Sequence, residues 1–442
     1  MNFQEALRDL DGRQPESMPE RGLDRIQALA ESLDHPELTY PSIHVTGTNG
    51  KTTTSRMVAE LACAQGIPAG AFVSPHVTSV TERLSLCGEP ISEEEFATEY
   101  GRLLPYVQQI ETGGHRVTYF ETLTALCYVW FADKPVGLGV FEVGMGGTWD
   151  ATNLIRGDVA VLCPIGLDHK ELGSTVAEVA SEKAGIIKEG RTALSREQRP
   201  EAMEVIGRRC DQVGATLLIE GRDFALTSRA QALGGQSLSI RGLHARYDDL
   251  FVPLFGEQLA RNAALSVAAC EALLGKALDE DAVRSAIGVV ESSGRLEVVG
   301  RRPLAVLDGA HNPDAAASLV AALPEAFRWE RLHLVIGMFQ DKEVEEVIRL
   351  MAPLVDRAYA CANSSPRSAP AQRVEQALAA AGVREVDRFG SVAEAVEAAR
   401  SAAGNEDLIL VTGSFYTVAD ARPMFVGARI AANEEGAPRD GR

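Results

Sequence analysis

The chain of 442 residues is 45% hydrophobic and 24% charged, which is typical of a soluble globular protein with two or three domains. Its 62 acidic and 43 basic residues give a net charge of −19, which argues against nucleic-acid and anionic-membrane partners. Apolar runs stop well before the ~18 residues of a membrane span, and the N-terminal MNFQEALRDLDGR lacks the character of a signal peptide, so we expect a cytoplasmic protein.

Short apolar runs alternate with helical stretches in the first part of the chain. PSIHVTG, GLGVFEVG and DVAVLCPIG are typical of buried strands, whereas SRMVAELACAQG and STVAEVASEKAG have helical apolar spacing. This alternation predicts a parallel sheet with crossover helices. Between about residues 190 and 255, ATLLIEGRDFAL, SLSIRGL and YDDLFVPL predict short antiparallel strands, and EQLARNAALSVAACEALLG predicts the helix that follows.

A polar, turn-rich segment at residues 292–303, SSGRLEVVGRRP, indicates a domain boundary. The later runs LAVLDGAHN, RLHLVIGMF, AYACANSS and DLILVTGSF predict a second series of strands separated by helices. We therefore expect an α/β fold with a larger domain over 1–293 and a smaller one over 294–442. A ligand would bind in a cleft between two such domains.

The seven cysteines are scattered singly, with no C-x-x-C pair. An odd, unpaired set in a long chain is typical of reduced thiols, and several lie in apolar runs. We therefore expect free thiols and no catalytic cysteine.

HVTGTNGKTTTSRM, residues 44–57, joins a predicted strand to a predicted helix. Its end fits the phosphate-loop pattern G-x-x-x-x-G-K-[ST], but Val45 occupies the first-glycine position and Gly47 follows two places later. Backbone N–H groups at the helix start favour a polyphosphate, Lys51 would reach the outer phosphates, and Thr52 would place its hydroxyl on Mg²⁺. A turn that contains Gly-Lys by chance is the alternative. The expected nucleotide-binding residues here are Gly47, Thr48, Asn49, Gly50, Lys51, Thr52 and Thr53.

Glu142 ends the apolar run GLGVFEV, and Asp168 and His169 follow the next strand, VLCPIG. The carboxyl ends of parallel strands share one edge of a sheet, where ligands bind. A carboxylate at that edge can hold Mg²⁺, which prefers oxygen ligands. The alternatives are that Glu142 caps the GMGG turn and that His169 is structural.

The sequence G-T-x-G-K-T resembles the ATP loop of the Mur ligase superfamily, a group of ADP-forming amide ligases. Further motifs resemble the dihydrofolate synthase/folylpolyglutamate synthase family, in its order, from about residue 20 to 425. They are SPHVTSVTERLSLCGEPIS, TYFETLTAL, FEVGMGGTWDATN, IGLDHKELGSTVAEVASEKAGIIK, SGRLEVV, LDGAHNPDAAASL, GMFQDKE and TGSFY. The resemblance implies an N-terminal P-loop ATPase domain and a C-terminal Rossmann-like domain that serves glutamate ligation.

The resemblance also implies a site with two Mg²⁺ ions. Thr52, Ser74 and Glu142 would serve the first ion, and Glu142, His169 and Lys188 the second. Lys188 matches a lysine that the family carbamylates, and a carbamate offers oxygen and negative charge where an ammonium group cannot bind a cation. The implied catalytic residues are Lys51, Glu142, His169, Lys188 and His311.

Other residues are assigned to ligands by the same resemblance. Asn262 would lie near adenine, Arg295 would bind ATP phosphate, and Asp308 and His311 would contact the nucleotide and the incoming glutamate region. Ser414 would lie close to glutamate, and Phe120 and Asp150 belong to segments that match the pterin pocket. Each also has an ordinary structural explanation, such as a capping histidine or a packed aromatic ring.

The implied reaction joins L-glutamate to a folate-type acceptor, dihydropteroate or a folyl-polyglutamate, through an acyl phosphate that ATP generates. GKTTT, GEQLARN, GGTWDATN and DHKELG depart from the sequences usual in the family. A Mur-family ligase for a non-folate carboxylate therefore stays open. A phosphate-loop nucleotide switch is a further alternative, and the absence of N-K-x-D counts against it. The family also implies a monomer.

Overall fold

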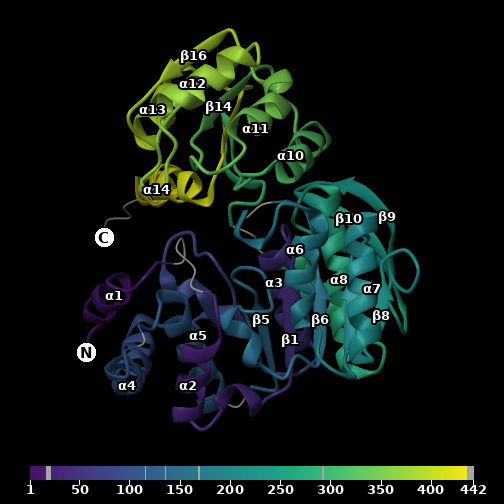
Figure 1. Ribbon diagram of the computed structural model, residues 1–442. Helices are drawn as coiled ribbons and strands as arrows, with labels where there is room; N and C mark the ends of the chain where they lie inside the picture. Colours follow the sequence, from purple (N-terminus) through teal and green to yellow (C-terminus); the bar gives the residue numbers. More distant parts are fainter. Residues whose placement is uncertain (16–20, 115, 135, 168–169, 291–292, 436–442) are drawn as a thin grey trace, which may run out of the picture. The chain divides into compact units, whose positions relative to one another are not determined.

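The computed structural model describes residues 1–15, 21–114, 116–134, 136–167, 170–290 and 293–435 (Figure 1). Contacts divide the chain into two compact units. The first comprises Met1–Pro253 and Gln258–Val290, and the second comprises Leu254–Glu257 and Glu291–Arg442.

The first unit is built on an eight-stranded sheet with the order β4-β3-β2-β5-β1-β6-β7-β8. Neighbours from β2 to β8 pair in parallel, whereas β3 and β4 add an antiparallel edge. All five residues of β1 and of β5 are buried, as expected for central strands covered on both faces. The strands are β1 Ser42–Thr46, β2 Ala69–Phe72, β3 Leu84–Leu86, β4 Glu89–Pro90, β5 Leu138–Glu142, β6 Val159–Leu162, β7 Thr192–Ser195 and β8 Thr216–Ile219.

A separate three-stranded antiparallel sheet, β11-β10-β9, lies in the same unit. It comprises β9 Ala225–Ala232, β10 Gly235–Arg241 and β11 Arg246–Val252. The predicted parallel and small antiparallel sheets are thus confirmed, but the assignment of ATLLIEGRDFAL is wrong in part. Its residues 216–219 form β8, which pairs in parallel with β7, because the helix α7 that joins the two strands returns the chain in the same direction.

Two clusters of buried side chains hold the helices of the first unit to the large sheet. One joins α1, α2, α4 and α5 to aromatic residues of β2 and β5, including Phe72 and Phe141. The other joins α6 and α7 to β6 and β7. The helices are α1 Phe3–Asp11, α2 Asp24–Ser32, α3 Lys51–Ala64, α4 Glu93–Thr112, α5 Tyr119–Asp133, α6 Val176–Lys183, α7 Pro200–Val213, α8 Glu257–Leu274 and α9 Glu280–Gly288, with 3-10 turns η1 Pro36–Leu38, η2 Val80–Arg83, η3 Ala151–Leu154, η4 Lys170–Leu172 and η5 Ala184–Ile186.

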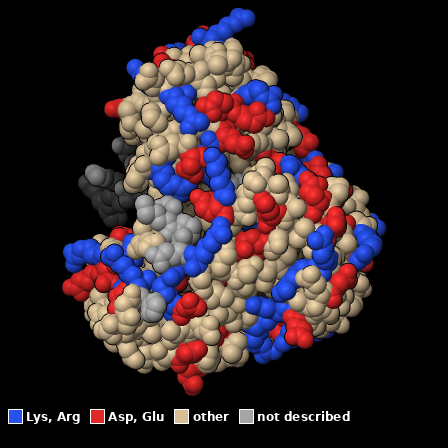
Figure 2. Space-filling view, viewed as in Figure 1, with Lys and Arg blue, Asp and Glu red and all other residues tan. Residues whose placement is uncertain are grey.

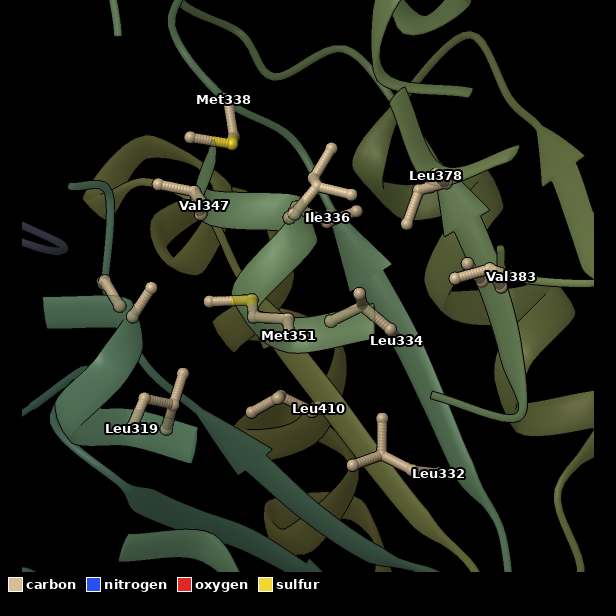
Figure 3. Close-up of a cluster of buried hydrophobic side chains, with 14 of the residues drawn as sticks. Leu319, Leu332, Leu334, Ile336, Met338, Val347, Met351, Leu378, Val383 and Leu410 are labelled. Carbon is tan, nitrogen blue, oxygen red and sulfur yellow. The ribbon is translucent and has the colours of Figure 1, made fainter. Parts of the chain in front are cut away.

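The second unit has a six-stranded sheet with the order β12-β13-β17-β14-β15-β16, parallel except for the β12–β13 pair. Figure 3 shows its core, in which Leu334 and Ile336 of β14 and Leu410 of β17 meet Leu319 and Met351 of the covering helices. The elements are β12 Glu297–Arg301, β13 Leu304–Leu307, β14 Leu332–Ile336, β15 Arg357–Ala360, β16 Glu385–Arg388, β17 Leu408–Thr412, α10 Pro313–Ala326, α11 Val344–Met351, η6 Ala352–Leu354, α12 Ala371–Ala380, α13 Val392–Ala402 and α14 Phe415–Glu435.

The prediction that every cysteine is a free thiol is wrong. Cys63 and Cys87 form a disulfide, and the other five cysteines are buried thiols. The pair is 24 residues apart in sequence, and the packing of the β3–β4 hairpin beside the end of α3 brings the two Cα atoms within 5.7 Å. The absence of C-x-x-C excludes only a local pair, not one that the fold creates.

Two surface properties bear on the possible partners. None of the described helices combines the length and apolar character needed to cross a membrane. Figure 2 shows basic and acidic side chains interspersed on the visible face.

Candidate functional site

The glycine turn between β1 and α3 forms a tightly packed loop. Gly47 has φ +151°, and a Cβ there would lie 2.6 Å from Cβ of Cys163. Gly50 caps α3 with φ +91°, and a Cβ there would lie 2.8 Å from Nδ2 of Asn262. Both positions therefore require glycine. Val45, by contrast, is a buried residue inside β1, which explains why the first glycine of the usual pattern is replaced there.

Hydrogen bonds fix this loop to the segment that follows β6. The Thr48 N–H donates to the Pro164 carbonyl over 2.8 Å, and the Thr48 hydroxyl donates to the Gly166 carbonyl over 2.9 Å. The Asn49 N–H also faces the Pro164 carbonyl, at 3.5 Å. Thr53 is buried in the first turn of α3, where the leading N–H groups of a helix lack intrahelical acceptors. These contacts hold the loop in place beside the segment that follows β6.

Glu142, at the end of β5, is 1% exposed and links the first turn of α3 to the segment that follows β2. The Thr52 hydroxyl donates to Oε1 over 2.9 Å, and the Ser74 N–H donates to Oε2 over 3.1 Å. Burial raises the pKa of Glu142, while Lys51, these two donors and Arg56 act in the opposite direction. Thr52, Ser74 and Glu142, which the resemblance assigns to the first ion, therefore meet at the carboxyl edge of the sheet.

This donor set fits a magnesium ion. A carboxylate and a hydroxyl are hard oxygen ligands, which Mg²⁺ accepts together with water and phosphate oxygens. Among the residues that the structure describes, no three His, Cys, Asp or Glu side chains gather at a metal-binding spacing. His169 and the preceding Asp168 lie outside the described residues.

Lys183 and Lys188, the two lysines of SEKAGIIK, occupy different places. Lys188 Nζ donates to the carbonyl and to Oδ1 of Asn153, over 2.7 and 2.8 Å. Burial lowers the pKa of Lys188 to about 8, with a further contribution from Arg209. Lys183 is 4% exposed, and its Nζ donates to the Gly47 carbonyl over 2.8 Å.

Lys183 is a site residue that sequence reasoning missed. Lys51 Nζ donates to the same Gly47 carbonyl over 3.2 Å, so two lysines reach the glycine turn. The available signal was the position of Lys183 on the last turn of a predicted helix that follows the β6 edge.

Phe120 and Asp150 both contact the GMGG turn after β5. The Phe120 ring packs so closely on Gly144 that a Cβ there would lie 2.6 Å from its Cζ. Asp150 accepts hydrogen bonds from the Met145 N–H and from the N–H and hydroxyl of Thr152. Burial raises the pKa of Asp150 to about 6. Asp150 therefore shapes the turn, and the ring of Phe120 lies beside it.

Asn262, on α8, is 2% exposed and lies against Gly50. Its Oδ1 accepts a hydrogen bond from Arg196 Nη1 over 2.5 Å. Arg196 was not predicted as a site residue, because an arginine in a turn after a strand is usually solvated. Here it is 1% exposed.

In the second unit, Asp308 follows β13 and is buried. Its carboxylate accepts from the Leu296 and Ala310 N–H groups, both over 2.9 Å, and burial raises its pKa. The guanidinium of Arg295 lies 4.6 Å from the centre of the Phe415 ring. His311 Nδ1 is 2.8 Å from the Gly309 carbonyl, so the predicted residues at 295, 308 and 311 belong to connected turns.

Ser414 follows β17 and is 1% exposed. Asn363 Nδ2 donates to the Ser414 hydroxyl and to the Thr417 hydroxyl, each over 3.1 Å. The two hydroxyls are themselves 3.0 Å apart. Asn363 was not predicted, and it fixes the orientation of the hydroxyl that was.

Comparisons with known proteins cover both units. The sequence matches the Mur ligase middle domain over residues 45–270 and the Mur ligase, glutamate ligase domain over residues 294–415. It is 38% identical to the dihydrofolate synthase/folylpolyglutamate synthase of Mycobacterium tuberculosis, over 94% of this chain and 92% of that protein. It is 31% identical to the Bacillus subtilis protein of the same name, over 91% and 94% of the two chains.

The solved structures to which this chain is similar include enzymes of the same kind. Folylpolyglutamate synthase of Mycobacterium tuberculosis, complexed with ADP and AMPPCP, has a TM-score of 0.91 and 37% identity over 96% of this chain and 98% of that chain. Escherichia coli FolC, in complex with DHPP and ADP, has a TM-score of 0.85 and 30% identity over 98% and 99%.

Proposed function

This chain belongs to the Mur ligase family, as one of the dihydrofolate synthase/folylpolyglutamate synthases, and we propose from that premise that it joins L-glutamate to a folate-type acceptor at the expense of ATP. The observation that carries the proposal is the meeting of Thr52 and Glu142 beside the phosphate loop. ADP and AMPPCP bound to the Mycobacterium tuberculosis relative, and ADP bound to the Escherichia coli relative, support ATP as the substrate here.

The phosphate loop binds the polyphosphate of ATP. Gly47, Gly50 and the first N–H groups of α3 form the cradle, Lys51 neutralises the outer phosphates, and Thr48, Asn49 and Thr53 complete the loop. Thr52, Ser74 and Glu142 would hold one Mg²⁺, and Glu142, His169 and a lysine would hold a second. When bound, the metal ions would supply positive charge to the migrating phosphoryl group.

The lysine partner of the second ion was assigned to Lys188 by resemblance. Its pKa of about 8 favours the neutral amine that carbamate formation needs. The contact of Lys183 with the Gly47 carbonyl favours Lys183 instead, because it brings that amine to the phosphate loop. We assign the role to Lys183 and keep Lys188 as the second candidate.

The reaction proceeds in two transfers. The acceptor carboxylate attacks the γ-phosphorus of ATP. The bond between that phosphorus and the bridging oxygen breaks, so ADP departs and the acceptor becomes an acyl phosphate. The glutamate amino nitrogen then attacks the acyl carbon, loses a proton and displaces phosphate, so an amide remains. The chain needs no nucleophilic side chain for either transfer. Its contribution is to position the groups and to stabilise charge.

Residues of the second unit serve the nucleotide and glutamate. Arg295 binds phosphate, Asp308 and His311 contact the nucleotide and the glutamate region, and Ser414 binds glutamate. The buried hydrogen bonds of Asp308 and Ser414 support this assignment, because they fix both side chains before substrate arrives.

In the first unit, Asn262 lies near adenine, and Phe120 and Asp150 belong to the acceptor pocket. The exposed part of the Phe120 ring beside the GMGG turn offers a surface on which a flat pterin can stack. The acceptor is dihydropteroate, a folyl-polyglutamate or both, and the DHPP bound to the Escherichia coli relative supports the first. The departures at GKTTT and GEQLARN favour one alternative, a Mur-type ligase for a non-folate carboxylate.

An acceptor comparison tests the function. Purified protein with ATP, Mg²⁺ and L-glutamate is given dihydropteroate, tetrahydrofolate or no acceptor, and phosphate release is measured together with the mass of the product. We expect release only with a pterin acceptor and a product heavier by one glutamyl residue. Turnover that requires glutamate but ignores both pterins would identify the non-folate ligase, and slow hydrolysis indifferent to every acid would identify a nucleotide switch.

We also assign the reaction to the cytoplasm, where ATP and glutamate are abundant, and to a monomer. Size-exclusion chromatography with light scattering tests the monomer, with a mass of 47.3 kDa expected.

A further inference from the structure

Arg196 is a buried cation close to the phosphate loop for which the proposed chemistry has no role. It follows β7 at the carboxyl edge of the sheet, and its side chain is 1% exposed. Nε donates to Glu220 Oε2 over 2.7 Å, Nη1 to Asn262 Oδ1 over 2.5 Å, and Nη2 to Gln258 Oε1 over 2.9 Å. The guanidinium therefore divides its donors between one carboxylate and two amides of α8.

Burying a guanidinium costs free energy unless its donors are paired. Glu220 supplies the compensating charge, and its carboxylate also accepts hydrogen bonds from Arg261, over 2.8 Å to each oxygen. One carboxylate thus serves two arginines, and Arg196 also donates to Asn262. The amide oxygens of Asn262 and Gln258 pair the remaining buried nitrogens of Arg196, and the first of these contacts also restrains the Asn262 amide.

The contact with Arg196 decides which way the Asn262 amide faces. An arginine has donors and no acceptor, so it must meet the amide oxygen of Asn262 and not its nitrogen. The nitrogen then lies 2.8 Å from the position that a Cβ of Gly50 would occupy, and the oxygen lies 3.2 Å from it. Without Arg196 the amide could rotate and exchange the two positions.

We propose that Arg196 is a positioning residue for the adenine nucleotide, because it holds Asn262 with its amide nitrogen facing the phosphate loop and the bound base. This inference rests on the proposed function, in which Asn262 lies near adenine. An amide nitrogen is a donor, and N1, N3 and N7 of adenine are acceptors, so the fixed orientation offers these ring nitrogens the complementary group. The reversed amide would set its oxygen, an acceptor, against them.

The test measures nucleotide binding in the full-length protein. Dissociation constants for ADP and for inorganic tripolyphosphate, both with Mg²⁺, are determined by calorimetry for the wild type, Arg196→Met, Asn262→Ala and the double variant. We expect Arg196→Met to weaken ADP about tenfold, as for loss of one oriented hydrogen bond, and to leave tripolyphosphate within twofold. The double variant should bind ADP no more weakly than Asn262→Ala, because Arg196 acts through that residue.

Arg261→Met is the matched control, because it removes the other arginine from Glu220 and leaves Arg196 in place to donate to Asn262. It should lose thermal stability as Arg196→Met does, yet bind ADP within twofold of the wild type. Arg196→Lys retains a donor and should recover part of the affinity. The inference would be overturned if Arg196→Met and Arg261→Met weakened ADP binding equally. It would also be overturned if the double variant weakened ADP binding by the product of the factors for Arg196→Met and Asn262→Ala. A wild type that binds tripolyphosphate but no adenine nucleotide would overturn both the inference and the proposed function.

Discussion

The Thr52 hydroxyl donates a hydrogen bond to Glu142 Oε1 over 2.9 Å, and this contact joins the first turn of α3 to the end of β5. It places the Glu142 carboxylate beside the phosphate loop. The next strand of the sheet contributes the Ser74 N–H to the other carboxylate oxygen.

Glu142→Gln should reduce glutamate-dependent phosphate release about 10²- to 10³-fold, because it removes the negative charge that holds the metal while keeping the shape of the side chain. Steady-state assays with saturating ATP measure the loss. Glu271→Gln is the control, since Glu271 is another fully buried carboxylate of the first unit that accepts from the Tyr247 hydroxyl. That variant should lose stability but keep its turnover per folded molecule, and similar losses of turnover in both variants would contradict the assigned role.

Gly50→Ala should abolish nucleotide binding, because Gly50 combines a left-handed φ of +91° with a close contact to Asn262. Gly66→Ala is a matched control at the other end of α3, where φ is +80° and no atom lies within 4 Å of the added Cβ. The backbone cost of about 1–2 kcal/mol is then common to both variants. ADP binding by calorimetry, with melting temperatures alongside, separates the two effects. Comparable binding by both variants would show that the contact with Asn262 is unimportant.

Lys183→Ala should reduce turnover more than Lys188→Ala, because Lys183 donates to the Gly47 carbonyl whereas Lys188 donates to Asn153. If Lys183 functions as a carbamate, added formate or acetate should restore part of the activity by supplying the missing carboxylate. Phosphate release is measured for both variants with and without these acids. If formate or acetate restored activity only to Lys188→Ala, Lys188 would be the lysine that functions as a carbamate.

Lys188 should make the stability of the first unit depend on alkaline pH. Burial lowers its pKa from 10.5 in the unfolded chain to about 8 in the fold. Between these values the unfolded chain binds more protons, so stability rises as pH increases from 8 toward 10.5. The melting temperature of Lys188→Met relative to the wild type should therefore fall as the pH is raised from 7.5 to 10. A constant difference would mean that Lys188 is not desolvated.

Asn363→Ala should raise the KM for glutamate about five- to tenfold and leave the KM for ATP unchanged, because Asn363 fixes the hydroxyls of Ser414 and Thr417 by two hydrogen bonds. Initial rates with each substrate varied in turn measure both constants. Ser414→Ala should show the same selective rise. If Ser414→Ala changed the KM for ATP but not the KM for glutamate, Ser414 would not belong to the glutamate site.

The sequence alone determined the features that depend on local patterns. The phosphate loop consists of contiguous segments: the apolar run of β1, the glycine turn and the following helix. Each segment specifies its own backbone conformation, so the sequence alone predicted the loop. Glu142 was located at the end of a buried strand for the same reason. Parallel strands bring their carboxyl ends to one edge, so Glu142 could be placed at that edge. Its grouping with Thr52 and Ser74 was implied by the resemblance to the family, and hydrogen bonds join the three in the structure.

The tertiary structure decided which distant side chains meet. Packing of α3 against the β3–β4 hairpin paired Cys63 with Cys87, and the α7 crossover made β8 a parallel strand. The end of α6 brought Lys183 to Gly47, while Lys188 reached Asn153. Arg196 became buried because Glu220 and α8 enclose it. Burial and charge pairing are properties of the three-dimensional neighbourhood, to which residues far apart in the chain contribute, and no local pattern contains them.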